Sequence, residues 1–299
     1  MNTWKLGIAP INWSNDDLRD LGGDTPLDRC LSEMAAAGYQ GTELGHKFPT
    51  EAAALEAVLK RHRLALASCW HSTFFVAEHD PRKQLEALDR RLELLAAVGT
   101  TVINLAECSG TVHGDRQKPL SARPRFSDLD FRHLADGLQA AGERCLRRGI
   151  RPAYHHHLGT GVQDEAEIER LLELTDPALL SLCYDTGHLA AAGVDPLAFA
   201  SRHESRIAHV HCKDVRPAIL AEVKERNLSF LEAVLRGLFT VPGDGMIEFG
   251  PIIALLEERS YDGWLIVEAE QDPRVADPLR YALAARNYLL GVAEHCDNT

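Results

Sequence analysis

Long hydrophobic runs are missing from this sequence. No stretch of about 18 consecutive apolar residues occurs, so no membrane-spanning helix is expected. The N-terminus lacks the basic start and long apolar segment of a secretory signal. Positive charge is in deficit, since 32 Lys and Arg face 44 Asp and Glu for a formal net charge of −12. This balance argues against binding to nucleic acid or an anionic membrane surface, so we expect a cytoplasmic protein with a small neutral or metal-chelating ligand.

Paired cysteines are also missing. The seven cysteines are dispersed and include no CxxC pair, which argues against a disulfide framework or a zinc ribbon. An odd number of scattered cysteines is typical of reduced, mostly buried thiols in a cytosolic protein. We expect this state for Cys30, Cys69, Cys108, Cys145, Cys183, Cys212 and Cys296.

Short apolar segments alternate regularly with segments that can form helices. With 299 residues, 45% of them hydrophobic, the chain can bury a large core. Eight strand-helix units predict an α/β fold, a (β/α)8 TIM barrel. The predicted strands are Leu6–Ala9, Gly41–Leu44, Leu64–Cys69, Thr101–Leu105, Pro152–His156, Leu180–Asp185, Ile207–Cys212 and Trp264–Glu268.

Two stretches interrupt the alternation. Residues 109–127 are rich in Pro, Gly, Arg and Ser, and residues 215–245 have a helical middle and end in PGDG. Long loops that follow barrel strands lie on the catalytic face and commonly shape the pocket. We therefore interpret residues 1–299 as one barrel domain with two lid-like insertions.

Three predicted strands end in a side chain that can bind a metal. Apolar runs lead into Asp185, His211 and Glu268. Carboxyl ends of barrel strands converge, and one imidazole with two carboxylates can hold a divalent cation. Alone, Asp185 could be a turn residue and His211 a core histidine. Their recurrence at three strand ends favours a metal site and therefore an enzyme.

Three consecutive histidines follow the fifth predicted strand. Because strand residues alternate in direction, His155 and His157 should point together and His156 away. Either of the first two could be a fourth metal ligand, and the other could contact the substrate. We interpret His156 as structural.

These motifs together carry a resemblance over nearly the whole chain. The last three strand ends resemble those of the xylose isomerase-like barrel superfamily in YDTGH, HVHCKD and PGDGMIEFGPIIALLEERSYDGWLIVEAE. A closer similarity, to the inosose dehydratase family, lies in GIAPINWSNDD, GYQGTELG, AYHHHLGTGVQ and WLIVEAEQDP. Each motif alone is weak, but the set is specific.

The resemblance implies a metal site built from Asp185, His211 and Glu268. Many superfamily members have a Glu at the end of strand five, where this chain places His155, with His157 as the competing ligand. One negative charge fewer should favour Mn²⁺ or Co²⁺ over Mg²⁺. The family is also associated with glutathione, but no glutathione motif is found.

The implied reaction is the loss of water from 2-keto-myo-inositol (scyllo-inosose) in myo-inositol catabolism, giving 3D-(3,5/4)-trihydroxycyclohexane-1,2-dione. Proton transfers need an acid and a base within hydrogen-bond reach. Lys213 could have a pKa lowered by a nearby cation, or could be an ion-pair partner of a carboxylate. Glu270 could instead orient a ligand histidine. The catalytic candidates are His157, His188, Lys213 and Glu270.

Predicted substrate contacts come from the ends of strands two to four. An aromatic wall with polar groups can orient a polyol ring, although Trp70 is equally interpreted as packing. Asn104 and Glu107 both end strand four, and each could equally reach the site or remain outside it. The predicted substrate-binding residues are Glu43, Trp70, His71 and Glu107.

Other classes compete with a dehydratase. A metal-dependent sugar isomerase or epimerase would begin with the same proton abstraction but would conserve mass. A polyol sensor would leave the predicted metal site without a purpose, and the acidic balance opposes a nuclease. Homo-oligomers are expected by analogy with the superfamily alone.

Overall fold

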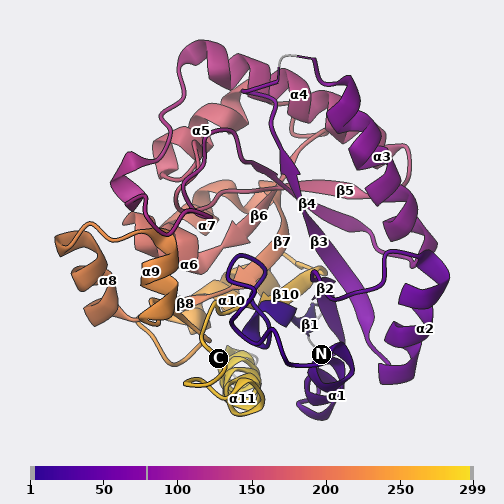
Figure 1. The fold of residues 1–299 in the computed structure, drawn as a ribbon, viewed down its shortest axis with the longest axis vertical. Coiled ribbons are helices and arrows are strands. Elements are labelled where there is room, and N and C mark those ends of the chain that lie inside the picture. The colour runs from indigo at the N-terminus through magenta and orange to yellow at the C-terminus, as the bar shows by residue number, and fades with distance from the viewer. Residues whose placement is uncertain (1–3, 79, 297–299) are drawn as a thin grey trace.

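The computed structural model describes residues 4–78 and 80–296, and within these ranges eight parallel strands close into a barrel (Figure 1). The order around the barrel follows the chain, and β10 pairs with both β7 and β1. The predicted TIM barrel is therefore confirmed. Its strands are β1 (Lys5–Ile8), β2 (Gly41–Leu44), β3 (Ala65–Thr73), β4 (Val102–Glu107), β5 (Arg151–His155), β6 (Ser181–Asp185), β7 (Ile207–Cys212) and β10 (Trp264–Val267).

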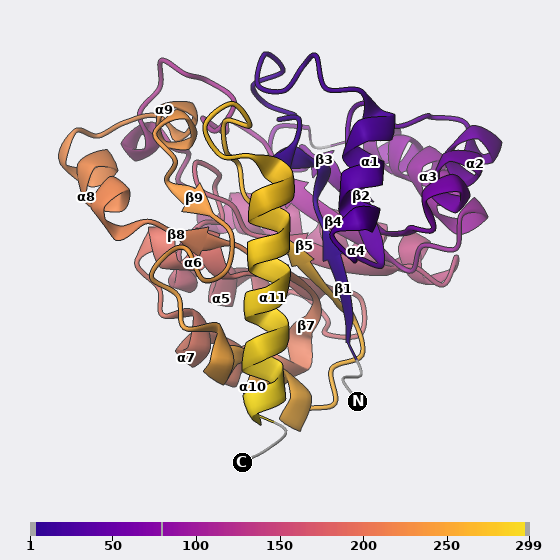
Figure 2. The same ribbon diagram turned by 90° about the horizontal axis from the view of Figure 1, so that it is seen from below.

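Helices cover the outside of the barrel (Figures 1 and 2). Leucines at helical spacing explain the packing of α3, where Leu85, Leu88, Leu92 and Leu95 are all buried. The helices are α1 (Leu27–Ala36), α2 (Ala52–His62), α3 (Arg82–Ala97), α4 (Asp128–Leu146), α5 (Glu165–Leu174), α6 (Thr186–Ala192), α7 (Pro196–His203), α8 (Pro217–Glu225), α9 (Phe230–Leu235), α10 (Phe249–Glu258) and α11 (Pro278–Cys296). None of those in the described ranges is long and apolar enough to cross a membrane.

Six cysteines with described side chains are buried free thiols. Burial in apolar surroundings raises the pKa of Cys69, Cys108, Cys145 and Cys212 to about 12. These thiols are therefore protonated near neutral pH and pack as small apolar groups. The side chain of Cys296 lies outside the described part of the structure.

The two predicted insertions pack against each other. The second contains α8 and α9 and is closed by β8 (Asp214–Val215) pairing antiparallel with β9 (Phe239–Thr240). Leu120 N donates a hydrogen bond to Leu228 O at 3.0 Å, a usual distance for a backbone hydrogen bond. Figure 2 shows α8 and α9 together on one side of the barrel. The insertions therefore form a connected wall beside the strand ends.

The first insertion is also attached to the loop after β5. Arg123 is buried and contacts Asp164 and Glu167, which form the capping box of α5. Val112 N donates to Gly159 O at 2.9 Å. These contacts hold residues 109–127 against the loop that carries the three histidines.

Candidate functional site

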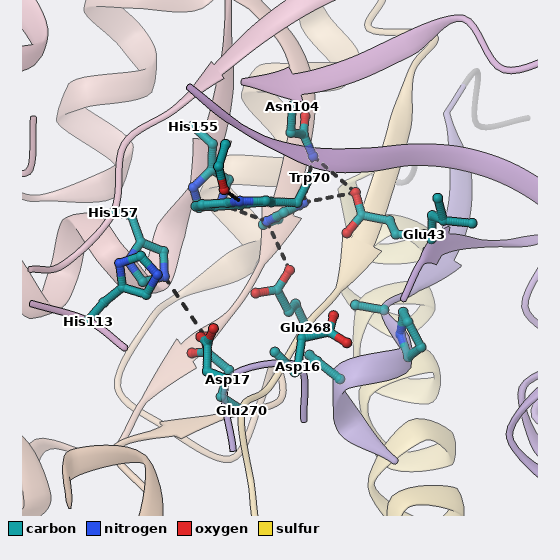
Figure 3. Close-up of a pocket in the computed structure, with 16 residues that line it drawn as sticks. Asp16, Asp17, Glu43, Trp70, Asn104, His113, His155, His157, Glu268 and Glu270 are labelled. Atoms are coloured by element: carbon teal, nitrogen blue, oxygen red, sulfur yellow. Dashed lines mark hydrogen bonds and ion pairs between the residues drawn. The ribbon is translucent and has the colours of Figure 1, made fainter. Parts of the chain in front are cut away.

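A cavity of about 290 Å³ opens at the carboxyl ends of the barrel strands (Figure 3). Seven of the twelve predicted site residues line it, from β2, β3, β5, β7 and the segments after β5 and β10. These are Glu43, Trp70, His155, His157, His211, Glu268 and Glu270. Parallel strands thus bring together side chains that are far apart in the chain.

Four side chains, three of which line this cavity, turn nitrogen and oxygen atoms toward one another. His211 Nδ1 lies 3.1 Å from His155 Nε2, 3.4 Å from Asp185 Oδ2 and 3.0 Å from Glu268 Oε2. His155 Nε2 lies 3.5 Å from Asp185 Oδ2. We call His155, Asp185, His211 and Glu268 the ligand set, because the sequence predicts these four as metal ligands.

The geometry of the ligand set fits a divalent ion. Ligand atoms about 2.1 Å from one ion, at octahedral or tetrahedral angles, are roughly 3.0–3.4 Å apart. Three of the four measured spacings fall within this range, and the fourth, from His155 Nε2 to Asp185 Oδ2, is 3.5 Å. Asp185 Oδ2 is buried and makes no hydrogen bond, although ring nitrogens and an ammonium lie within 4 Å of it. A buried carboxylate oxygen that makes no hydrogen bond has a lone pair free to bind a cation.

Charge around Asp185 keeps its carboxyl group ionised. Burial would raise the pKa of Asp185, but the charges of Lys213 and His188 outweigh it and hold the pKa well below its ordinary value. For His211, burial would lower the pKa, yet its acidic neighbours raise it well above the ordinary value; they include Cys183, Glu43 and Glu268. Buried carboxylates and buried cationic groups thus stabilise each other at the centre of the barrel.

Glu43 lies on the opposite side of His211 from the rest of the ligand set. Its Oε1 is 3.1 Å from His211 Nε2 and 2.9 Å from His209 Nε2. Burial would raise the pKa of Glu43, but the two histidines hold it well below the ordinary range. Glu43 is therefore a buried carboxylate at the base of the cavity.

Lys213 extends beneath the ligand set. Its fully buried Nζ lies 2.6 Å from Glu268 Oε1, 3.3 Å from Glu270 Oε2, 3.4 Å from Asp185 Oδ2 and 3.0 Å from His188 Nε2. Burial would lower the pKa of Lys213, but the three carboxylates raise it above the ordinary value. Of the two interpretations from sequence, the ion pair is thus present, and the lowered pKa is not found among the protein groups alone.

Glu270 and His157 are neighbours in the wall of the cavity. His157 Nε2 lies 3.9 Å from Glu270 Oε1. Burial raises the pKa of Glu270 to about 8, against the opposing charge of Lys213, while burial and His113 lower the pKa of His157 well below its usual value. His188 packs on His157, with ring centroids 3.8 Å apart. His188 and Lys213 do not line the cavity but support the two residues that do.

Two predicted substrate contacts are not brought to the cavity. Trp70 and Ser72 of β3 line it, whereas His71, between them, does not. Burial and the charge of Arg91 lower the pKa of His71 to about 4. Glu107 is buried, and its carboxylate accepts hydrogen bonds from Thr73 Oγ1, Phe75 N and Ser109 N at 2.9, 3.0 and 3.1 Å.

Several residues near the site were not predicted from sequence. Asp16 and Asp17 line the cavity, as does His113 from the first insertion. Both acids belong to the GIAPINWSNDD motif, and His113 lies in a segment expected on the catalytic face. The sequence therefore indicates the segments that reach the site but not these individual residues. Asn104, which the sequence leaves equally able to reach the site or remain outside it, lines the cavity and donates to Glu43 Oε1 at 3.1 Å.

Sequence comparison identifies relatives along nearly the whole chain. The family described as xylose isomerase-like TIM barrel matches residues 31–289. The inosose dehydratase of Mesomycoplasma hyopneumoniae (strain 7448) is 46% identical over 286 residues, covering 95% of each chain. The inosose dehydratase of Bacillus anthracis (strain CDC 684 / NRRL 3495) is 44% identical over 289 residues, covering 96% of this chain and 97% of the relative.

Solved structures share the fold at lower sequence identity. An L-ribulose 3-epimerase matches with a TM-score of 0.72 and 15% identity, covering 99% of this chain and 96% of the other. The probable 3-DHS dehydratase AsbF of Bacillus anthracis matches with a TM-score of 0.71 and 18% identity, covering 96% and 98%. This chain belongs to the xylose isomerase-like TIM barrel family. Within that family it groups with the inosose dehydratases and is accordingly a dehydratase, an enzyme of the lyase class.

Proposed function

We propose that this dehydratase depends on a divalent metal and removes water from 2-keto-myo-inositol, giving 3D-(3,5/4)-trihydroxycyclohexane-1,2-dione in myo-inositol catabolism. We infer the substrate from the relatives, which are named as dehydratases of inosose. Metal dependence rests chiefly on one observation, the convergence of four ligand atoms around the unbonded Asp185 Oδ2.

The ligand from β5 is His155 in this proposal. His155 Nε2 faces Asp185 Oδ2 and His211 Nδ1, whereas His157 Nε2 faces Glu270. Two imidazoles and two carboxylates favour Mn²⁺ or Co²⁺ over Mg²⁺. When bound there, such an ion supplies Lewis-acid polarisation of a carbonyl group.

Glu270 and His157 are the groups we assign to proton transfer. Both line the cavity next to the ligand set, so both can reach a substrate held there. One must take the proton beside the ketone, and another must protonate the hydroxyl that leaves as water. Lys213 and His188 contact these two residues from behind and hold them in place.

Trp70 forms one wall of the substrate site. Its ring lies 5.2 Å from the ring of His155 and 5.6 Å from that of His157, both edge-on. A rigid aromatic face beside two polar groups can orient the ring of a polyol. Asp16 and His113 supply polar groups at other points of the same cavity.

Product analysis tests this proposal. Metal-replete and chelator-stripped protein are incubated with 2-keto-myo-inositol, and the product is followed by mass and by the absorbance of the enolised dione. The proposal is supported if the stripped protein no longer removes water from the substrate and adding Mn²⁺ or Co²⁺ restores this activity. A product of unchanged mass would indicate an isomerase or epimerase instead. Dehydration by protein that contains no metal ion would contradict the proposed metal dependence.

A further inference from the structure

One oxygen of Glu43 is the meeting point of four polar groups. The carboxylate lies at the end of β2, and its neighbours come from β3, β4 and β7. They are Ser68 Oγ, Asn104 Nδ2 at 3.1 Å, His209 Nε2 at 2.9 Å and His211 Nε2 at 3.1 Å. All five side chains are buried.

This arrangement keeps a proton on Nε2 of His211, which leaves Nδ1 as the nitrogen that can bind a metal ion. A carboxylate only accepts hydrogen bonds, so the Nε2 atoms of His209 and His211 must donate to it. A neutral imidazole with a proton on Nε2 has a lone pair on Nδ1. In His211, Nδ1 is the atom that lies 3.0–3.4 Å from the other members of the ligand set.

We infer that Glu43 is a positioning residue that orients His211 for metal binding, and that Ser68, Asn104 and His209 hold the Glu43 carboxylate in place. This inference rests on the proposed function, because it needs an ion at the ligand set. A histidine ligand commonly donates its second N–H to a carboxylate, which aligns the ring and increases its basicity.

The inferred role differs from the substrate contact predicted for Glu43. If the carboxylate turned toward a substrate, the buried N–H groups of His209 and His211 would lose their acceptor. Leaving two buried donors without a partner is unfavourable. Removing Glu43 should therefore weaken the metal site before it affects substrate affinity.

A cobalt titration of metal-stripped protein tests the inference, using Co²⁺ alone and its visible absorption. Glu43→Ala removes the carboxylate, while Glu43→Gln keeps the shape of the side chain and guards against misfolding in the smaller variant. Glu107→Gln is the matched control, because it changes a buried Glu that does not contact the ligand set. Thermal melts of all four proteins verify folding.

We expect both Glu43 variants to bind Co²⁺ about 10- to 100-fold more weakly than the wild type, and Glu107→Gln to bind it as the wild type does. In Zn²⁺-loaded protein with ¹⁵N-labelled histidine, the Nε2–H proton of His211 should resonate at low field and lose that position in Glu43→Ala. A structural defect alone would not change this signature selectively.

Two results would overturn the inference. Unchanged Co²⁺ affinity in both Glu43 variants, with only KM raised, would make Glu43 a substrate contact. A wild-type protein that binds no Co²⁺ would overturn the metal site itself. The second result is seen in the wild type alone, so failure of the proposed function is distinguished from failure of the positioning role.

Discussion

The carboxylates at the ends of β6 and β4 are equally buried but differ in their partners. Asp185 ends β6, and one of its oxygens makes no hydrogen bond while cationic and imidazole groups surround it. Glu107 ends β4, and hydroxyl and backbone N–H donors bind both of its oxygens. In sequence, each is an acid at the end of an apolar run.

The difference shows what separates a reactive carboxylate from a structural one. Hydrogen bonds from Thr73, Phe75 and Ser109 make Glu107 a brace for the turn after β3 and for its own loop. Asp185 retains an open position that a cation can fill. Burial alone therefore does not identify the site; the unmet bonding capacity does.

Removing a ligand from the reactive region should have the largest effect. His211→Ala or Glu268→Ala should abolish bound metal and activity together, since each removes one of four convergent ligand atoms. Metal content by atomic emission and turnover of 2-keto-myo-inositol measure both. Activity retained in either variant would remove the metal site from the mechanism.

Lys213→Met should separate the contribution of the buried ammonium group to turnover from metal binding. We expect metal to remain bound while turnover falls by about 10²-fold or more, because Glu270 loses the ammonium group that holds it. In the metal-free variant, the buried carboxylates that Lys213 neutralises would repel one another, which should lower the free energy of unfolding by about 3–5 kcal/mol. Steady-state kinetics and urea unfolding provide the measurements, and unchanged turnover would show that the lysine is dispensable for proton transfer.

Glu107→Gln should affect stability more than catalysis. The neutral amide weakens hydrogen bonds to Thr73, Phe75 and Ser109, for an expected loss of about 1–3 kcal/mol in the free energy of unfolding. Turnover should stay within about two-fold of the wild type. A large rise in KM with normal stability would restore the substrate contact predicted from sequence.

His71→Ala should have the smallest effect on the reaction. His71 lies between two cavity-lining residues but does not line the cavity itself. We expect kcat and KM within about two-fold of the wild type. A Trp70→Ala variant measured in parallel should raise KM clearly; equal behaviour of the two variants would mean that this interpretation of β3 is wrong.

Strand alternation explains which parts of the site could be predicted. The rule placed His155 and His157 on one side and His156 on the other, and the structure agrees: the first two line the cavity, while His156 packs against Phe199. Applied to β3, the same rule would have allowed only one of Trp70 and His71 to face inward. Apolar runs likewise located all eight strands, since barrel strands are buried on both faces.

Irregular segments could not be predicted in this way. Asp17 and His113 reach the cavity from loops without periodicity, so their positions depend on contacts formed only in the folded chain. The network at Glu43 had the same limit. His209 and Glu43 are 166 residues apart in sequence and meet only when the barrel closes.

The most direct test of the metal site is a crystal structure of the protein with Mn²⁺, using anomalous scattering to locate the ion. We predict one anomalous peak enclosed by His155 Nε2, Asp185 Oδ2, His211 Nδ1 and Glu268. A peak held by His157 and Glu270 instead, or no peak at the barrel centre despite activity in the crystal, would contradict the account.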